Sequence, residues 1–343
     1  MKRVAILCGG RSSEHEISCI SAGGVLSAID RSKFEPIVIG ITKSGKWVYI
    51  PEDFPLAISN GKLPVIPEDA PTVVADVAGF SLAGKPLNID TVFPVLHGPF
   101  GEDGTIQGML EIAGIPYIGS GVLASAVAMD KSFAKPIFAA HGIKVAPGCT
   151  ISAEEWRSNR EAAVGQISQF GYPLFIKPAR GGSSRGTHKV KSEEGLLPAI
   201  EDALLFDSKV MAEKAIVGSE IECAVLEIDG SPRASLVGKI IIDSKFEFYD
   251  FEAKYLDGAT SIQLPAPIDS KISDHIRALA LQAFRALGCR DLARVDFFLT
   301  EQGEVIINEL NTMPGFTATS VFPKMWEATG LSYSEIITEL LSR

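Results

Sequence analysis

The sequence predicts an α/β protein of two or three domains that opens with a Rossmann-like parallel sheet. Its 343 residues exceed what one hydrophobic core of ordinary size organises. In the N-terminal part, β-branched segments alternate with segments of helical periodicity, which favours parallel strands joined by helices. Later segments read as antiparallel hairpins, which indicates α+β units. The composition, 46% hydrophobic and 22% charged, is typical of a folded globular chain.

The N-terminal part supplies the parallel sheet, with strands expected at 2–8, 34–41 and 91–96. A glycine turn at Gly9-Gly10 follows the first strand. A helix is predicted from about Ser13, with Glu16 three residues on as in a capping box. The loop 97–104 follows the third strand and leads into a helix from Thr105. Ligands of parallel sheets bind where the strands end, so we expect functional residues in both loops.

The rest of the chain is expected to form two further units, which gives domains at 1–120, 121–213 and 214–343. The middle unit has expected helices at 124–140, 153–169 and 193–205, and expected strands at 172–178, 187–191 and 210–215. The last unit begins with strands from residue 218. It continues with a helix at 270–287, paired strands at 293–300 and 304–309, and a final helix from Ser332.

Charge and cysteine usage exclude several classes of protein. The formal net charge is -10 and no basic run occurs, which disfavours a nucleic-acid partner. The five cysteines have no CxxC spacing, which argues against a zinc site or a disulfide framework and favours a reducing cytoplasm. The first apolar run is too short for a signal peptide, and none approaches the ~20 residues of a membrane span. We therefore expect a cytoplasmic protein with a small-molecule substrate.

The strongest chemical pattern lies in the hairpin near the C-terminus. Arg294 and Asp296 share one face of a strand, and Glu309 and Asn311 share one face of the next. If the hairpin is centred between residues 302 and 303, Asp296 falls opposite Glu309. Two carboxylates and an amide among apolar neighbours suit Mg²⁺ carried in with nucleotide phosphates. The alternative is a solvated sheet edge with both acids facing water.

A second pattern follows Lys177, which ends a strand and precedes a glycine-rich hairpin turn at 178–186. Backbone N–H groups of such a turn can contact phosphate oxygens. The segment lacks the order of a Walker loop, and a strand follows it where a P-loop would have a helix. An ordinary mobile hairpin is the alternative. Together with a Mg²⁺ site, the turn indicates a flap over a nucleotide.

Two loops could complete the site. In the loop after Gly9-Gly10, Glu14 and Glu16 fit a bound ammonium group better than a phosphate, although plain helix capping is the simpler interpretation. His97 is the histidine best placed for function, at a strand end beside a glycine loop. The polar and aromatic stretch 243–263 is typical of a lid that excludes water, or of a half-buried strand.

Seven segments closely resemble the D-alanine:D-alanine ligases, in order and with suitable spacing, over nearly the whole chain. They are GGRSSEHEIS (9–18), FPVLHGPFGEDGTIQG (93–108), MDK (129–131), FIKPARGGSSRG (175–186), YDFEAKY (249–255), ARVDFF (293–298) and NELNTMPGFTATS (308–320). The resemblance implies an ATP-grasp fold, with a substrate-binding domain at 1–120 and ATP between a flap-bearing central domain and a C-terminal domain carrying lid and metal. It also implies an ADP-forming ligase that makes D-alanyl-D-alanine for peptidoglycan through a D-alanyl phosphate.

The resemblance further implies which residues act. ATP is contacted by Lys131, Lys177, Ser183, Glu213, Lys214, Ile216, Glu220, Asn308 and Glu309, and the metal, Mg²⁺ or Mn²⁺ as two ions, by Asp296, Glu309 and Asn311. The implied catalytic set is Glu14, Ser183, Lys254, Tyr255, Arg294 and Gly315. In the family, Glu14 holds the ammonium of the first substrate, and Ser183 and Tyr255 are the hydrogen-bonding partners of Glu14. Lys254 lies near the transferred phosphate, and Arg294 with the Gly315 N–H stabilises the oxyanion. The two D-alanine subsites involve Glu14, His97, Ser320 and Val321.

Departures from the family pattern concern the flap and the second subsite. Arg185 and His188 stand where the family more often has apolar or small residues. Ligases that make D-Ala-D-Ser tend to carry arginine at the position of Val321, so this apolar residue favours D-alanine. The resemblance also implies a homodimer. The alternatives are another ATP-grasp carboxylate-amine ligase, an oxidoreductase, which the missing GxGxxG pattern disfavours, and a nucleotide sensor without catalysis.

Overall fold

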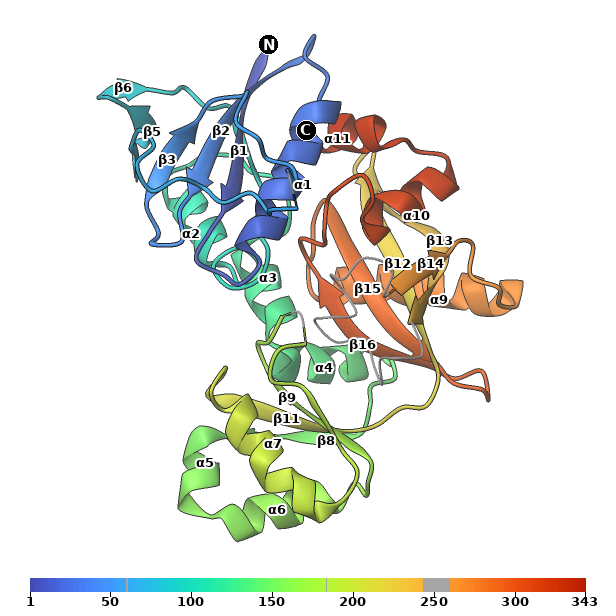
Figure 1. The fold of residues 1–343 in the computed structure, drawn as a ribbon. Helices are drawn as coiled ribbons and strands as arrows, with labels where there is room; N and C mark the ends of the chain where they lie inside the picture. Colours follow the sequence, from blue (N-terminus) through green and yellow to red (C-terminus); the bar gives the residue numbers. More distant parts are fainter. Residues whose placement is uncertain (60, 183, 243–259) are drawn as a thin grey trace.

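The computed structural model describes residues 1–59, 61–182, 184–242 and 260–343. Figure 1 shows an N-terminal lobe at the upper left, a C-terminal lobe at the right and a central lobe below them. The two ends of the chain lie near each other at the top, where the Lys2 ammonium donates to the Leu341 carbonyl over 3.1 Å. In the ranges that are described, every helix falls short of the length or apolarity that a membrane crossing requires.

The N-terminal lobe is built on a four-stranded sheet in the order β3-β2-β1-β7. Strand β1 runs parallel to β2 and β7, which confirms the predicted parallel sheet, and β3 is an antiparallel edge strand that the sequence reading missed. The main elements are β1 (Lys2–Gly9), α1 (His15–Ala28), β2 (Phe34–Ile41), β3 (Trp47–Ile50), β7 (Thr91–Pro94) and α2 (Thr105–Ile112). A small sheet adds β4 (Val73–Asp76), β5 (Gly79–Leu82) and β6 (Lys85–Pro86).

Strand β1 is apolar on both faces because a helix covers each face. Val4 and Ile6 belong to the core that contains α1, whereas Ala5 and Leu7 belong to the core that contains Ile106 of α2. A strand buried on both sides reads as a continuous apolar run, as Val4 to Cys8 does. The strand ends at Gly9 and Gly10, whose φ angles of 84° and 100° are left-handed and favour glycine.

The predicted capping box at the start of α1 is wrong. The helix begins at His15 with Glu14 at the N-cap position, and no side chain caps it. Glu16 instead pairs with Lys43 in the turn between β2 and β3. The Ser12 hydroxyl donates to the His97 carbonyl over 2.7 Å and accepts from the Glu14 N–H over 3.2 Å. The loop before α1 is therefore bound to the loop that follows β7, and α1 begins at His15, after the predicted start at about Ser13.

The central lobe is an antiparallel sheet in the order β10-β9-β11-β8, packed on helices α5, α6 and α7. Its elements are β8 (Gly148–Ser152), α5 (Ala153–Ser158), α6 (Arg160–Ser168), β9 (Leu174–Pro178), β10 (His188–Val190), the 3₁₀ turn η1 (Glu193–Gly195), α7 (Leu196–Ala203) and β11 (Lys209–Lys214). The pairing of β9 with β10 confirms the predicted hairpin around the glycine-rich turn.

Two helices expected as continuous are interrupted. The segment 124–140 forms α3 (Val122–Met129) and α4 (Lys131–Ala140), and Asp130 between them accepts from the Ser132 N–H as the cap of α4. In the segment 153–169, Asn159 separates α5 from α6 and accepts from the Ala162 N–H. Short acidic and amide side chains compete for helical N–H groups, so each residue begins a new helix.

The C-terminal lobe is a five-stranded sheet in the order β14-β13-β12-β15-β16. Its elements are β12 (Ser219–Ile228), β13 (Ser231–Ile242), β14 (Thr260–Gln263), α9 (Ser270–Ala286), β15 (Leu292–Leu299), β16 (Val305–Asn311), α10 (Val321–Thr329) and α11 (Tyr333–Leu341). Helix α9 packs on one face of the sheet. The other face shares a core with the N-terminal sheet. In this core, the rings of Phe316 and Phe93 pack edge to face, with their centroids 5.4 Å apart.

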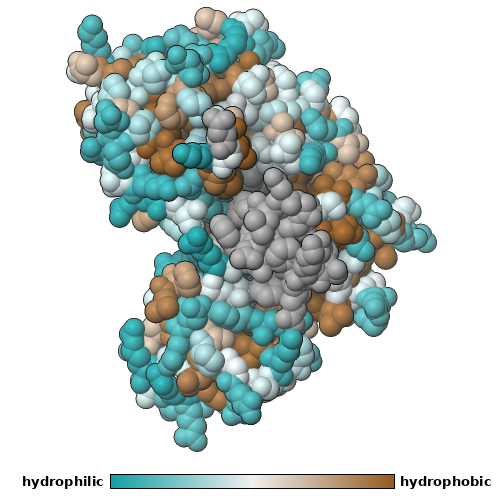
Figure 2. Space-filling view, viewed as in Figure 1, coloured by the Kyte–Doolittle hydropathy of each residue, from teal (hydrophilic) through white to brown (hydrophobic). Residues whose placement is uncertain are grey.

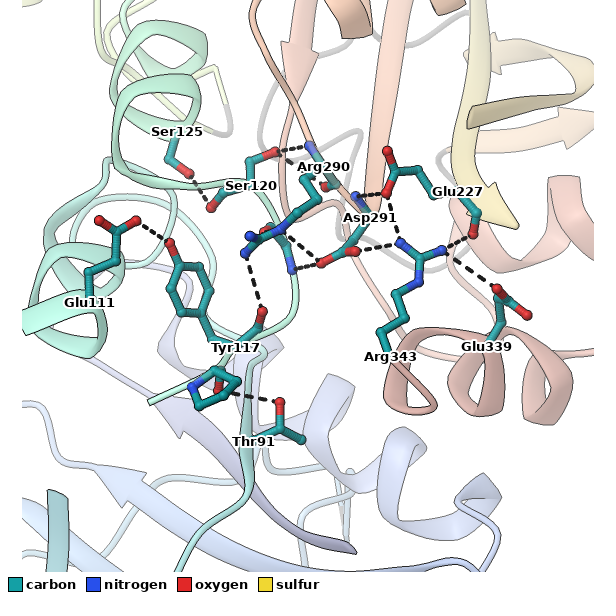
Figure 3. Close-up of polar contacts among 12 residues, drawn as sticks. Thr91, Glu111, Tyr117, Ser120, Ser125, Glu227, Arg290, Asp291, Glu339 and Arg343 are labelled. Carbon is teal, nitrogen blue, oxygen red and sulfur yellow. Dashed lines mark hydrogen bonds and ion pairs between the residues drawn. The ribbon is translucent and has the colours of Figure 1, made fainter. Parts of the chain in front are cut away.

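A polar junction beside this shared core joins the two upper lobes (Figure 3). The Asp291 carboxylate accepts from the Gly119 N–H over 2.7 Å, and the Arg290 guanidinium donates to the Gly119 carbonyl. Arg343 pairs with both Asp291 and Glu227. Strand β15 begins one residue after Asp291, so the junction sets the position of β15 relative to the N-terminal lobe.

Candidate active site

Two cavities meet where the lobes converge, and Figure 2 shows the surface hollowed between the central lobe and the upper lobes. One cavity, of about 470 Å³, lies among the N-terminal loops, the end of β16 and the start of α10, and we call it the amino-acid cavity. The other, of about 620 Å³, lies between the central and C-terminal sheets, and we call it the nucleotide cavity. Both are lined by Lys131, Gly181, Ile240 and Glu309.

Glu14 reaches the amino-acid cavity from the N-cap of α1. A β-carbon added at Gly98 would lie 2.6 Å from the Glu14 Oε2 atom, and one added at Gly182 would lie 3.2 Å from it. The carboxylate therefore packs against the backbone of two loops, one from the N-terminal lobe and one from the glycine-rich turn of the central lobe. Small residues are needed at this crossing because a side chain would occupy the carboxylate's place.

His97 lines the same cavity with its ring almost fully buried. Its Nδ1 atom lies 3.0 Å from the Met313 carbonyl oxygen, and its Nε2 atom lies 3.0 Å from the Ser21 hydroxyl. Burial lowers the pKa of His97, which outweighs the attraction of the nearby Glu14 carboxylate. Because both ring nitrogens are engaged, the histidine ties the N-terminal lobe to the segment that follows β16.

The β15–β16 hairpin places Asp296 opposite Glu309, as predicted, and also places Arg294 opposite Asn311. The route to that register differs from the expectation. Near the turn, the pairs 297–307 and 298–306 centre the hairpin on residue 302. A register shift beside Asp296 leaves Asn308 unpaired and moves the pairing by one residue, so that the two carboxylates meet. The predicted flanking residues Val295, Phe297, Ile306 and Ile307 are buried.

Arg294 sits in a cluster of carboxylates on this sheet. Its guanidinium makes two 2.8 Å contacts with Asp296, and its Nε atom lies 3.0 Å from a Glu222 oxygen. Asn311 also donates to Asp296 over 3.2 Å. Glu222 lies directly opposite Asp296 on β12 and is 3% exposed. Sequence reasoning missed this residue, although a charged residue in the middle of an apolar strand was a signal of a buried partner.

Lys131 connects the hairpin to the flap. Its ammonium lies 2.9 Å from the Glu309 carboxylate and donates to the Gly181 carbonyl over 3.0 Å. Asp296, Glu309 and Asn311 together offer oxygen atoms only, which suits a hard divalent cation. Arg294 contacts Asp296 and Lys131 contacts Glu309, so both carboxylates of this set lie beside positive charge. Among the described residues, no cluster of three or more His, Cys, Asp or Glu side chains forms a metal site.

A buried ion cluster forms one wall of the nucleotide cavity. Glu213 pairs with Lys135 and lies 2.7 Å from the Lys177 ammonium, and Lys177 also donates to Asn308 over 3.3 Å. Burial alone would raise the pKa of Glu213, but the two lysines lower it to about 2. Burial lowers the pKa of Lys135 to about 8. Lys135 was not predicted, and its place in a helical segment carried no signal of this contact.

The structure brings most of the expected site residues together. The nucleotide cavity is lined by Lys131, Lys177, Glu213, Lys214, Ile216, Glu220, Asp296, Asn308 and Glu309, and the amino-acid cavity by Glu14, His97, Arg294, Asn311, Gly315, Ser320 and Val321. Ser183, Lys254 and Tyr255 lie outside the described residues, as does most of the expected lid. The end of that segment forms β14, paired with β13.

The remaining expected residues have other partners. His188 contacts Asp202 of α7 over 2.7 Å, so it faces the body of the central lobe. Arg185 lies within the glycine-rich turn and is exposed. Lys324, one turn into α10, lines the amino-acid cavity with Ser320 and was not predicted. A lysine four residues after an expected substrate contact on a helix shares its face, which was the available signal.

Two solved ligase structures match nearly the whole chain. The D-Ala:D-Ser ligase VanG from Enterococcus faecalis is 39% identical with a TM-score of 0.86, covering 99% of this chain and 98% of that one. The D-alanine-D-alanine ligase from Coxiella burnetii is 33% identical with a TM-score of 0.84, covering 100% and 94%. The fold and the joined cavities therefore define an ADP-forming ligase of the ATP-grasp fold, a class that uses ATP and a divalent metal.

Sequence comparison narrows this class. Models described as the D-ala D-ala ligase N-terminus and C-terminus match residues 3–120 and 137–342. A D-alanine--D-alanine ligase of Paenarthrobacter aurescens is 48% identical, covering 99% of this chain and 94% of the relative. One from Streptomyces coelicolor is 46% identical, covering 99% and 92%. The chain belongs to the D-alanine–D-alanine ligase family.

Proposed function

We propose that this chain joins two D-alanine molecules into D-alanyl-D-alanine for peptidoglycan synthesis, with conversion of ATP to ADP and phosphate. The observation that carries the proposal is the meeting of the two cavities at Lys131 and Glu309. A nucleotide in one cavity can present its terminal phosphate to a carboxylate bound in the other. The product of that transfer is a D-alanyl phosphate, which the second D-alanine attacks through its amine.

In this proposal, the first D-alanine binds between the lobes. Glu14 holds its ammonium group, supported by Ser183 and Tyr255, and His97 lies close to this subsite. Arg294 and the Gly315 N–H stabilise the oxyanion of the tetrahedral intermediate, and this role is supported by the position of both residues in the lining of the same cavity. A water-excluded cavity strengthens these contacts relative to bulk water.

The phosphates lie along the cations of the central lobe. Lys131 and Lys177 contact them, Lys254 lies near the transferred group, and the metal is held by Asp296, Glu309 and Asn311. The metal, Mg²⁺ or Mn²⁺ as two ions, neutralises charge on the transferring phosphoryl group when it is bound. The adenosine contacts Glu213, Lys214, Ile216 and Glu220, which border the nucleotide cavity at the connection from β11 to β12.

The second D-alanine binds at the start of α10. Ser320 is the N-cap of this helix and Val321 its first residue, and both line the amino-acid cavity. The helix N-terminus and Lys324 favour a carboxylate at this position. Val321 presents an apolar surface, which favours the methyl group of D-alanine over a hydroxyl.

A second candidate is a ligase that makes D-Ala-D-Ser, because the VanG ligase with that activity matches the whole fold. The two candidates differ at the second subsite and share the phosphoryl chemistry. Val321→Arg is expected to raise the share of D-Ala-D-Ser in a mixture of D-alanine and D-serine. Lys324→Met is the control, since it weakens either second substrate without changing the ratio.

We further propose that the enzyme is a cytoplasmic homodimer, with a substrate domain at 1–120, a flap-bearing domain at 121–213 and a metal-bearing domain at 214–343. The first experiment measures phosphate release from ATP with D-alanine, L-alanine, or D-alanine plus D-serine or D-lactate, and identifies products by mass. We expect phosphate and D-Ala-D-Ala to appear together, and only when D-alanine is the substrate. ADP formation without dipeptide, or a mixed product, would move the assignment to another ligase of this fold.

A further inference from the structure

The amino-acid cavity contains a carboxyl group that the proposed chemistry leaves without a role. Glu102 lies in the loop between β7 and α2 and lines this cavity. One of its oxygens, Oε1, accepts a 2.7 Å hydrogen bond from the Gly98 N–H. Across the ranges that the structure describes, no residue donates to its other oxygen, Oε2. Glu102 therefore offers one anchored and one available oxygen to whatever occupies the cavity.

The loop that carries Glu102 is rigid. The Glu102 N–H donates to the Gly98 carbonyl over 2.9 Å, and the Gln107 amide of α2 donates to the Gly101 carbonyl over 2.8 Å. A β-carbon added at Gly101 would lie 2.6 Å from the Leu96 carbonyl oxygen, so the backbone of the loop packs directly against the backbone of Leu96. A carboxyl on such a loop holds its position without help from a bound ligand.

Charged groups from several elements face Glu102. These are Glu14 of the α1 N-cap, Arg294 of β15 and Glu309 of β16, and Glu102 in turn acts on Lys131 of α4. Burial, followed by the repulsion of Glu14, raises the pKa of Glu102 to about 8. Glu102 therefore holds a proton more tightly than an ordinary carboxyl group does.

The neighbouring groups are less suited to exchange a proton with substrate. Both nitrogens of His97 are held by Ser21 and Met313. Glu14 packs between Gly98 and Gly182, where the proposed function places an ammonium that remains charged. Arg294 stays protonated at any working pH. Among the described residues that line this cavity, Glu102 combines an available oxygen with a pKa of about 8, which is close to neutral pH.

We propose that Glu102 is the catalytic residue that accepts the proton released when the second amino acid attacks the acyl phosphate. This inference rests on the proposed ligase function. The ammonium of the second D-alanine gives a proton to Oε2, and its nitrogen forms a bond to the carbonyl carbon. The bond from that carbon to the phosphate oxygen then breaks, and the departing phosphate takes both the electron pair of that bond and the second proton of the nitrogen. The dipeptide, phosphate and a protonated Glu102 result.

The proposal predicts the direction of the pH dependence. Glu102 accepts a proton only when ionised, and its ionised fraction grows as the pH rises through its pKa of about 8. Dipeptide formation at saturating substrates should therefore rise with pH and level off above that value. In Glu102→Gln this titration is absent, and the residual rate should follow the free-amine form of the second D-alanine alone.

The test separates the two chemical steps. Wild type and Glu102→Gln are given ATP, metal and D-alanine, with or without hydroxylamine, which is unprotonated at neutral pH and attacks the acyl phosphate as a free amine. Glu102→Gln should lose roughly 10²-fold or more in dipeptide formation, the usual contribution of a positioned base. It should retain D-alanine hydroxamate formation. Glu102→Asp should recover part of the dipeptide rate, and Asp69→Asn, an exposed acid of the same lobe, is the control.

The outcomes are distinct. Selective loss of dipeptide with hydroxamate retained, together with loss of the pH limb near 8, supports the role. A dipeptide rate close to wild type overturns it, as does a parallel loss of hydroxamate, which would place Glu102 in substrate binding or in the first step. If the wild-type enzyme itself forms neither dipeptide nor hydroxamate, the proposed ligase function fails, independently of Glu102.

Discussion

Glu213 is the carboxylate whose removal should most affect the stability of the central lobe. Its side chain is 6% exposed and forms ion pairs with two lysines. The side chain of Lys135 is also 6% exposed, and that of Lys177 is 13% exposed. Glu213→Gln keeps the shape of the side chain but leaves two buried cations without a counter-charge. Breaking a buried pair in this way costs about 3–5 kcal/mol. Since the pKa of Lys135 is already lowered to about 8, this lysine can release its proton in the variant, which favours the lower end of that range.

The measurement is urea unfolding without nucleotide. Trp156 is buried in the same core as Val210 and Ala212 of β11, so its fluorescence in a background with Trp47 and Trp326 replaced by phenylalanine reports on this lobe. Lys144→Met with Glu304→Gln provides the comparison, because that 2.6 Å pair is 65% and 50% exposed and should contribute at most about 1 kcal/mol.

Two further measurements sharpen the test. Adding Lys135→Met to Glu213→Gln should recover stability, because an apolar side chain needs no counter-charge. The lowered pKa of Glu213 also predicts the pH dependence: its stabilising effect is complete above its ordinary pKa of 4.5 and is lost as the pH falls towards about 2. The difference between wild type and variant should narrow over that interval. A cost for Glu213→Gln no larger than that of the exposed pair would refute the reasoning.

The remaining predictions concern the hairpin and the Glu14 contact. Arg294→Ala should bind ATP normally and lose roughly 10²-fold in dipeptide formation, and near-normal turnover would remove it from the oxyanion site. Asp296→Asn should raise the metal concentration needed for activity, whereas an unchanged metal titration would remove it from the metal site. Gly98→Ala should raise KM for D-alanine by displacing Glu14, while Gly84→Ala, which has a similar positive φ angle but open space around it, should leave KM unchanged.

Local rules recovered much of the fold. Strand β2 has the predicted bounds, and α9 begins at the predicted residue and ends within one residue of the predicted end. Strand β2 is a nearly continuous apolar run and α9 has the apolar periodicity of a helix, so neighbouring residues decide both elements. The interruptions at Asp130 and Asn159 were missed because the apolar pattern continues through both residues. There, one hydrogen bond to a backbone N–H outweighs the periodicity.

The sequence by itself determined the candidate chemistry of this protein: the paired acids of the last hairpin, the glycine-rich turn after Lys177 and the family to which the motifs belong. Only the tertiary structure decided how these parts meet. The bulge at Asn308 aligns Asp296 with Glu309, and three lobes join the two cavities at Lys131. The charged neighbours of Glu102 and Glu222 come from elements far away in the chain. Burial and electrostatic partners depend on such distant contacts, which residue spacing along one chain does not specify.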